Sequence, residues 1–213
     1  MSPDVNEAIV EGLAQTFMEN DFEIVPVLSQ LFKSEHFFDP GTEGVIIKSP
    51  YDVELCLTNE LSALFRNSYT KVFVRPHTLN TGQAILMPPN VAGWQGNLSW
   101  ITSNFMILRW EGLIESLDGS YGFRTAPFRT FVQQLMQENN VDVEVTCRAI
   151  MNFFVSRPVL EERDYTEGLA VFKGDVPSNY FEDGTWNLDF ESVPEQVLAL
   201  VKFIVTIPEF QLK

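Results

Sequence analysis

Apolar side chains recur every three or four positions along most of this chain, which is the spacing of an amphipathic α-helix. The first two runs cover about residues 5–17 and 23–34, with the helix-breaking pair Asn20-Asp21 between them. This arrangement predicts a helical hairpin, and Ser2-Pro3 is suited to cap its start. Five further helices are expected: one from Pro50, three over about 98–117, 127–138 and 143–154, and a last one after a capping box of Ser192 and Glu195.

Sequence patterns typical of β-strands are few. The β-branched runs Val45-Ile46-Ile47 and Val72-Phe73-Val74 are short, and we interpret them as extended connectors rather than as parts of a sheet. A turn-forming stretch at residues 39–44 separates the hairpin from the next helix. We therefore expect an all-α fold, in which residues 1–213 form a single irregular multi-helix domain with helical hairpins and long ordered loops.

Composition and charge restrict the classes of partner. The 213 residues are 45% hydrophobic and 20% charged, which suits a folded domain and excludes wholesale disorder. Acidic residues outnumber basic ones by 29 to 14, for a net charge of −15, so nucleic acids and anionic membranes are disfavoured as partners. No apolar stretch reaches the roughly 18 residues of a membrane-spanning helix, and residues 1–4 do not resemble the start of a signal peptide.

The negative charge is concentrated in residues 157–195, called the acidic segment below. This segment holds ten acidic and three basic side chains, and so carries a charge of −7. Gly174, Pro177 and Gly184 favour a loop over a helix here. The aromatic residues of the segment indicate that it packs against the body of the protein. A loop of this length is unusual, so we expect it to serve a function.

Calcium is the one metal that the acidic segment suggests, because acidic loops rich in Asn and Gly suit hard cations. The candidate ligands are Asp183, Asp189 and Glu191. They do not form an EF-hand, since Phe181 and Phe190 stand at the third and twelfth loop positions, where oxygen ligands are needed. No other cofactor is expected.

Residues suited to catalysis are scarce. The two histidines, His36 and His77, have no second histidine at metal-ligand spacing. Cys56 and Cys147 both lie in apolar helical patterns, which is typical of unreactive buried thiols. The sequence also lacks the Gly-x-Ser-x-Gly nucleophile elbow and the glycine-rich phosphate-binding patterns. This chain alone is therefore not expected to be an enzyme.

The most unusual stretch is residues 82–101, called the elbow below. Pro88-Pro89 ends any helix there and forces an extended path. Trp94 and Trp100 either pack the elbow onto the core or offer a stacking surface to a sugar or a peptide. On the second interpretation, the candidate binding residues are Trp94, Gln95, Asn97 and Trp100 of the elbow, together with Trp186 of the acidic segment.

Four ordered motifs resemble those of a large bacterial family called domain of unknown function 1800. They are residues 31–37; Ile47-Lys48-Ser49-Pro50 with Glu54; Gly82-Gln83 with residues 87–94 and Trp100-Ile101; and residues 208–212. Arg109 also stands where this family tends to carry an arginine. The chain departs from the family pattern at Ala92 and Ile207, and the acidic segment matches none of its motifs.

The resemblance implies that the chain is the C-terminal portion of a larger protein, typically exported to the periplasm or cell surface. It carries over no catalytic residues. The preferred function is a non-catalytic interaction or scaffold domain, whose partner is another exported protein or a surface polysaccharide. Two alternatives stay open: a carbohydrate-binding or carbohydrate-processing module that uses exposed tryptophans, and part of a metal-dependent hydrolase completed by a missing N-terminal region.

Overall fold

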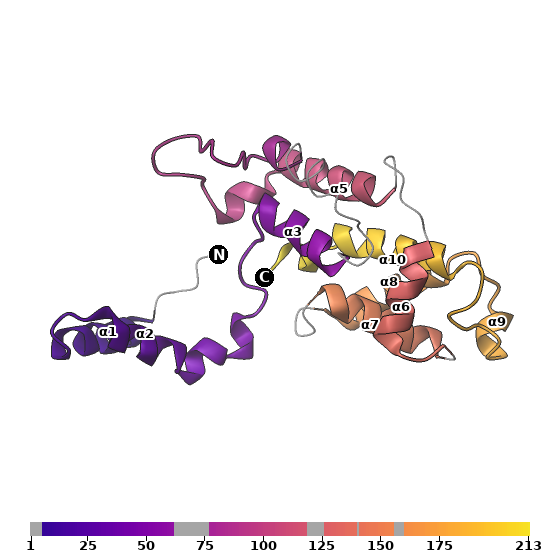
Figure 1. Cartoon of the computed structure of the whole chain (residues 1–213), viewed down its shortest axis with the longest axis horizontal. Helices are drawn as coiled ribbons and strands as arrows, with labels where there is room; N and C mark the ends of the chain where they lie inside the picture. Colours follow the sequence, from indigo (N-terminus) through magenta and orange to yellow (C-terminus); the bar gives the residue numbers. More distant parts are fainter. Residues whose placement is uncertain (1–5, 62–76, 119–125, 140, 156–159) are drawn as a thin grey trace. The chain divides into compact units, whose positions relative to one another are not determined.

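The computed structural model describes residues 6–61, 77–118, 126–139, 141–155 and 160–213 (Figure 1). The expected Ser2-Pro3 helix start and the connector at 72–74 lie outside these residues. The fold is all-α, as predicted, and an isolated antiparallel bridge joins Ile47 to Leu212. Contacts divide the chain into two compact units, Met1–Val45 and Ile46–Lys213. The division follows the turn-rich stretch at 39–44.

The first unit is the predicted helical hairpin. Helix α1 (Glu7–Glu19) is capped by the side chain of Asn6, and α2 (Ile24–Phe32) returns beside it. The chain reverses through Asp21 and Phe22, which take left-handed φ angles of 51° and 63°. Two 3-10 turns, η1 (Glu35–Phe38) and η2 (Pro40–Thr42), complete the unit.

The second unit begins with the helix predicted from Pro50, and the structure adds a capping box that was not predicted there. Helix α3 (Pro50–Glu60) is capped by Ser49, whose hydroxyl accepts from the backbone N–H of Asp52 while the Asp52 carboxylate accepts from the backbone N–H of Ser49. The helix expected over 98–117 is instead two elements, the 3-10 turn η3 (Asn97–Ile101) and α5 (Ser103–Leu117). Thr102 separates them, because its backbone is extended and its hydroxyl caps α5.

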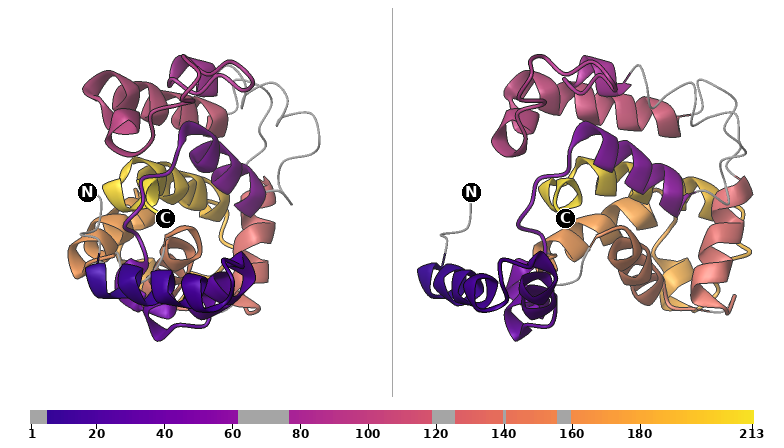
Figure 2. Two further views of the ribbon diagram at one scale, coloured as in Figure 1. Left: turned by 90° about the vertical axis from the view of Figure 1, so that its left-hand side faces the viewer. Right: turned by 60° about the vertical axis from the view of Figure 1, so that its left-hand side comes forward.

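The rest of the second unit is built around one central helix. Helices α6 (Ala126–Met136) and α7 (Val143–Phe154) agree closely with the sequence prediction. They are followed by α8 (Glu162–Lys173), the short α9 (Asn179–Glu182), α10 (Val193–Thr206) and the 3-10 turn η5 (Pro208–Gln211). Helices α5, α6, α7 and α8 all pack against α10, which lies in the middle of the unit (Figure 1, Figure 2). Eight residues of α10 are buried, as expected of a helix surrounded by others.

Two predictions for the acidic segment are wrong. Residues 162–173 form α8 rather than a loop, because Tyr165, Gly168 and Phe172 give the helix a buried face. Gly174 does not break this helix but ends it, with a φ of 51° at the C-cap. The expected capping box at Ser192 is also wrong, since the Ser192 hydroxyl donates to Oε1 of Gln196 and does not cap α10.

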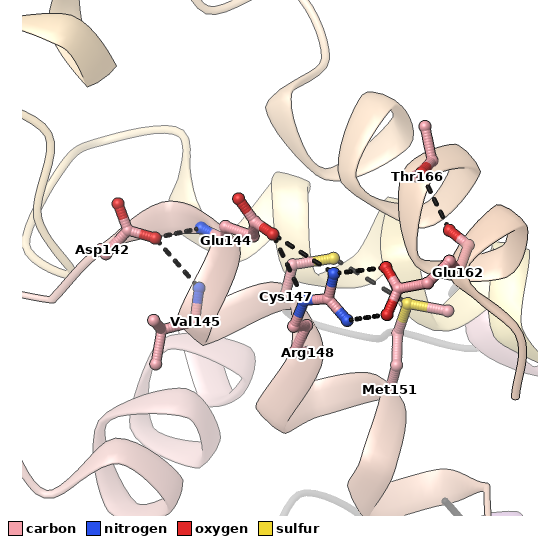
Figure 3. Close-up of polar contacts among 8 residues, drawn as sticks. All are labelled: Asp142, Glu144, Val145, Cys147, Arg148, Met151, Glu162 and Thr166. Atoms are coloured by element: carbon pink, nitrogen blue, oxygen red, sulfur yellow. Dashed lines mark hydrogen bonds and ion pairs between the residues drawn. The ribbon is translucent and has the colours of Figure 1, made fainter. Parts of the chain in front are cut away.

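Arg148 joins α8 to α7 (Figure 3). Its guanidinium donates to both carboxylate oxygens of Glu162, over 3.1 and 2.7 Å, and to Glu144 one turn earlier on α7. It also stacks on the ring of Tyr165 at 4.5 Å. The hydrogen bond from Arg148 holds the pKa of Glu162 below its ordinary value. The acidic residues of α8 thus help to orient the helix.

Candidate functional site

A buried arginine connects the end of the elbow to other parts of the second unit. Arg109 of α5 is fully buried, and its Nη1 donates to the backbone carbonyl of Trp100, 3.3 Å away. Nε donates to Oε1 of Gln211 at 3.1 Å, and Nη2 donates to the carbonyl of Lys48 at 2.8 Å. Burial lowers the pKa of Arg109 to about 10, so the side chain is still charged at neutral pH. Arg109 therefore ties α5 to the preceding turn η3 and to two segments that are distant in sequence, at Lys48 and Gln211.

Lys48 makes a second buried connection beside Arg109. Its Nζ donates to the carbonyl of Phe210 at 2.7 Å and lies 4.4 Å from the centre of the Phe210 ring. Nζ is also 3.7 Å from Sγ of Cys56. Burial lowers the pKa of Lys48 and raises that of the Cys56 thiol, so Cys56 is not poised as a nucleophile.

A buried ion pair completes this region. Nδ1 of His77, in the helical turn at 77–80, pairs with the carboxylate of Glu54 on α3, and both side chains are buried. Nε2 of His77 donates to the carbonyl of Leu108 at 2.9 Å. Burial alone would lower the pKa of His77, but the hydrogen bond and charge of Glu54 outweigh it and raise that pKa. The ring lies against Gly112, where a Cβ atom would stand 2.2 Å from it.

Sequence reasoning missed this buried polar network, defined here as Lys48, Glu54, His77, Arg109 and Gln211. Its members come from the residues just before α3, α3 itself, the turn at 77–80, α5 and η5, and all five are buried. The charged groups are occupied by hydrogen bonds within the fold. The arrangement can hold helices together, but it presents no accessible acid, base or nucleophile to a substrate.

The structure separates the predicted tryptophan candidates. Trp100 is 6% exposed and Trp186 is 3% exposed, so neither offers a face for stacking. The indole N–H of Trp186 donates to Gln196, near the start of α10. The carbonyl of Trp100 accepts from Arg109, which also donates to Gln211, beyond the C-terminal end of α10. Trp94 is half-buried. Its indole nitrogen is enclosed and has no hydrogen-bond partner among the described residues.

Two polar candidates of the elbow stay in contact with solvent. Gln95 and Asn97 are exposed, and Asn97 takes a left-handed φ of 59° where η3 begins. With Trp100 and Trp186 buried, the candidates that keep exposed surface are Gln95, Asn97 and the half-buried Trp94.

The predicted calcium ligands lie at the surface. Asp183, Asp189 and Glu191 are all exposed. The Asp189 carboxylate accepts from Nε2 of Gln133 at 3.0 Å and from Nδ2 of Asn139 at 3.1 Å. In the described parts of the chain, no three His, Cys, Asp or Glu side chains gather in a way that would hold a metal ion. Asp189 serves there to attach the acidic segment to α6 and the turn that follows it.

The acidic segment also forms a pocket of about 460 Å³ between α8 and α10. This α8–α10 pocket is lined by the end of α8, the turn that follows, and the start of α10, through Val171, Gly174, Asp175, Val176, Pro177, Phe190, Ser192, Glu195, Gln196 and Ala199. Its volume is within the range of about 300–1,000 Å³ that is usual for binding pockets. The pocket lies in the segment for which the sequence predicts a function, although its lining residues are not the ones proposed.

A model of the family described as "Protein of unknown function (DUF1800)" matches residues 1–212. The chain belongs to this family. The resemblance seen in the sequence motifs is thereby confirmed over essentially the whole chain. Neither the curated proteins nor the solved structures contain a match to it. Among the helices that the structure describes, none is long and apolar enough to span a membrane.

Two of the four motifs of this DUF1800 chain, the second and the last, contribute residues to the buried polar network. Lys48 and Glu54 belong to the second motif and Gln211 belongs to the last, and Arg109 of α5 bonds to Gln211 and to the carbonyl of Lys48. Gln83 of the elbow motif also bonds within the fold, since its Oε1 accepts from the backbone N–H of Tyr51 at 2.9 Å. These motif residues stabilise the fold, whereas the pocket lies in the segment that matches no motif.

Proposed function

We propose that this chain is a non-catalytic interaction domain of an exported bacterial protein, and that it binds another exported protein through the α8–α10 pocket. The observation that carries the proposal is a contrast in accessibility. The charged groups of the buried polar network are enclosed and hydrogen-bonded, while the α8–α10 pocket is open to a ligand. Export rests on the family resemblance.

The lining of the pocket supports binding rather than catalysis. It has apolar side chains, two carboxylates and one amide, with no histidine, cysteine or lysine among them. Both ends of the Gln196 amide are hydrogen-bonded within the fold, because Nε2 donates to the carbonyl of Phe172 and Oε1 accepts from Trp186 and Ser192. Such a lining can recognise a partner by shape and charge.

Capture from envelope extracts tests this function. The whole chain is immobilised, bound proteins are cross-linked and identified, and the strongest candidate is then purified and mixed with the chain. The proposal predicts a complex that co-elutes in size-exclusion chromatography. Absence of any partner that reconstitutes with the purified chain would overturn it.

Carbohydrate binding is a second candidate, and it rests on the elbow alone. The Trp94 side chain is half-buried, and exposed Gln95 and Asn97 are its neighbours in sequence. An accessible part of an indole ring can pack on a sugar, and exposed amides can form hydrogen bonds with sugar hydroxyls. A polysaccharide panel screened with the wild type and Trp94→Phe tests this, and identical responses from the two proteins would exclude it.

A further inference from the structure

We infer that the α8–α10 pocket takes an apolar side chain from an extended peptide of its partner, with lysine or arginine on either side of that residue. This inference rests on the proposed function and adds the chemistry of the partner. The pocket walls are Val171, Val176, Phe190 and Ala199, which are all half-buried. Apolar walls of this kind favour an aliphatic or aromatic anchor, since apolar burial at one central residue supplies most of the affinity of such contacts.

The rim of the pocket explains the basic neighbours. Asp175 and Glu195 both line the pocket and are both exposed. Helix α8 ends at the same place, at Gly174, and a helix C-terminus carries partial negative charge. The basic side chain next to the rim, Lys173, lies over the ring of Phe181 at 5.3 Å. Carboxylates and the helix end therefore combine in a negative rim that attracts cations flanking the anchor.

The pocket is formed before any ligand arrives. Gln196 is 6% exposed, and its side chain joins α10 to the carbonyl of Phe172 at 2.8 Å and to the indole of Trp186 at 3.2 Å. Arg129 of α6 fixes the backbone at the lining residue Phe190, because its guanidinium donates to the carbonyls of Leu188 and Phe190 over 2.6 and 2.9 Å. A pocket with fixed walls loses little conformational entropy on binding, so a short peptide is sufficient as a ligand.

A set of four synthetic peptides tests this chemistry on the whole chain. All are seven residues long and fluorescently labelled: Gly-Ser-Lys-Leu-Lys-Ser-Gly, and versions with glutamate flanks, with serine flanks, or with serine in place of the central leucine. Binding is measured by fluorescence anisotropy and by NMR titration. The lysine–leucine peptide should bind most tightly. Losing the leucine should weaken binding at least about tenfold, and losing both lysines about two- to tenfold.

Variants of the chain locate the site. Ala199→Phe fills the pocket and should weaken the lysine–leucine peptide at least about tenfold. Asp175→Asn and Glu195→Gln should each weaken it about two- to fivefold, with the difference disappearing at high salt. Glu182→Gln is the matched control, because Glu182 is an exposed acid of the same segment outside the pocket lining, and it should bind like the wild type. Far-UV circular dichroism checks that each variant is folded.

Equal binding of all four peptides, or no binding, would overturn the inference. So would a folded Ala199→Phe variant that keeps wild-type affinity. If the envelope capture succeeds and the peptides fail, the proposed function stands and only the partner chemistry is wrong. If both fail, both proposals fall.

Discussion

Replacing Arg109 with methionine should destabilise the second unit by about 3–5 kcal/mol, the usual loss when one member of a buried charged network is removed. The fully buried guanidinium donates to three acceptors, on Lys48, Trp100 and Gln211. A hydrogen bond from a charged donor contributes about 1.5–3 kcal/mol, so three contribute about 4.5–9 kcal/mol. These values are already net of dehydration, but bonds made by one group are not additive and methionine keeps part of the packing, which brings the net loss to the stated range.

Urea unfolding at pH 7, followed by circular dichroism and tryptophan fluorescence, measures this loss. Arg109→Lys keeps the charge but not the planar fork of donors, and should lose an intermediate amount of stability. Arg148→Met is the matched control. Arg148 is an arginine with comparable hydrogen bonding on the solvated side of α7, so its removal should have a much smaller effect. A free energy of unfolding for Arg109→Met equal to that of Arg148→Met would refute the reasoning.

The other contacts give three further expectations. Gly112→Ala should lose about 1–3 kcal/mol in thermal unfolding, because its Cβ would stand 2.2 Å from the ring of His77; a wild-type melting temperature would contradict that packing. Although burial opposes it, Glu54 raises the pKa of His77 above its ordinary 6.5, so the stability of the pair is complete below about pH 6.5 and is lost as pH rises through the raised pKa. Urea unfolding from pH 6 to 9 should show this decline in the free energy of unfolding, and Glu54→Gln should remove it. If the free energy of unfolding falls equally with pH in both proteins, the decline does not come from the pair of His77 and Glu54. Gln196→Leu should lose about 1–3 kcal/mol in urea unfolding, because it leaves the indole N–H of Trp186 without its acceptor; an unchanged unfolding midpoint would argue against that role.

Local signals in the sequence predict most of the helices. The apolar period over residues 143–154 places α7 with its observed bounds, and Ser49-Pro50 marks the start of α3. The error at α8 has a physical cause. Gly174 and Pro177 are signs of a helix end as much as of a loop, and the apolar positions Tyr165, Leu169 and Phe172 already had helical spacing.

The buried polar network was beyond local reasoning. Arg109 bonds to residues 61 and 102 positions away, and no short-range pattern indicates such pairs. Burial of Trp100 and Trp186 likewise depends on packing, since an indole suits both a core and a binding surface. The charge pattern was more informative. The excess of acidic residues marks the segment that contributes most of the pocket lining, although α8 and α10 supply part of that lining where the sequence predicts a packed loop.

Photocrosslinking from the rim of the α8–α10 pocket, in the native bacterium, tests the interaction function most directly. A photoreactive phenylalanine analogue replaces Pro177, which is exposed and lines the pocket, and in a parallel strain it replaces Glu182 outside the lining. We predict an adduct with one envelope protein from position 177 that is absent at position 182 and is lost when Ala199→Phe fills the pocket. No adduct from position 177, or the same adduct with the pocket filled, would contradict the proposed interaction.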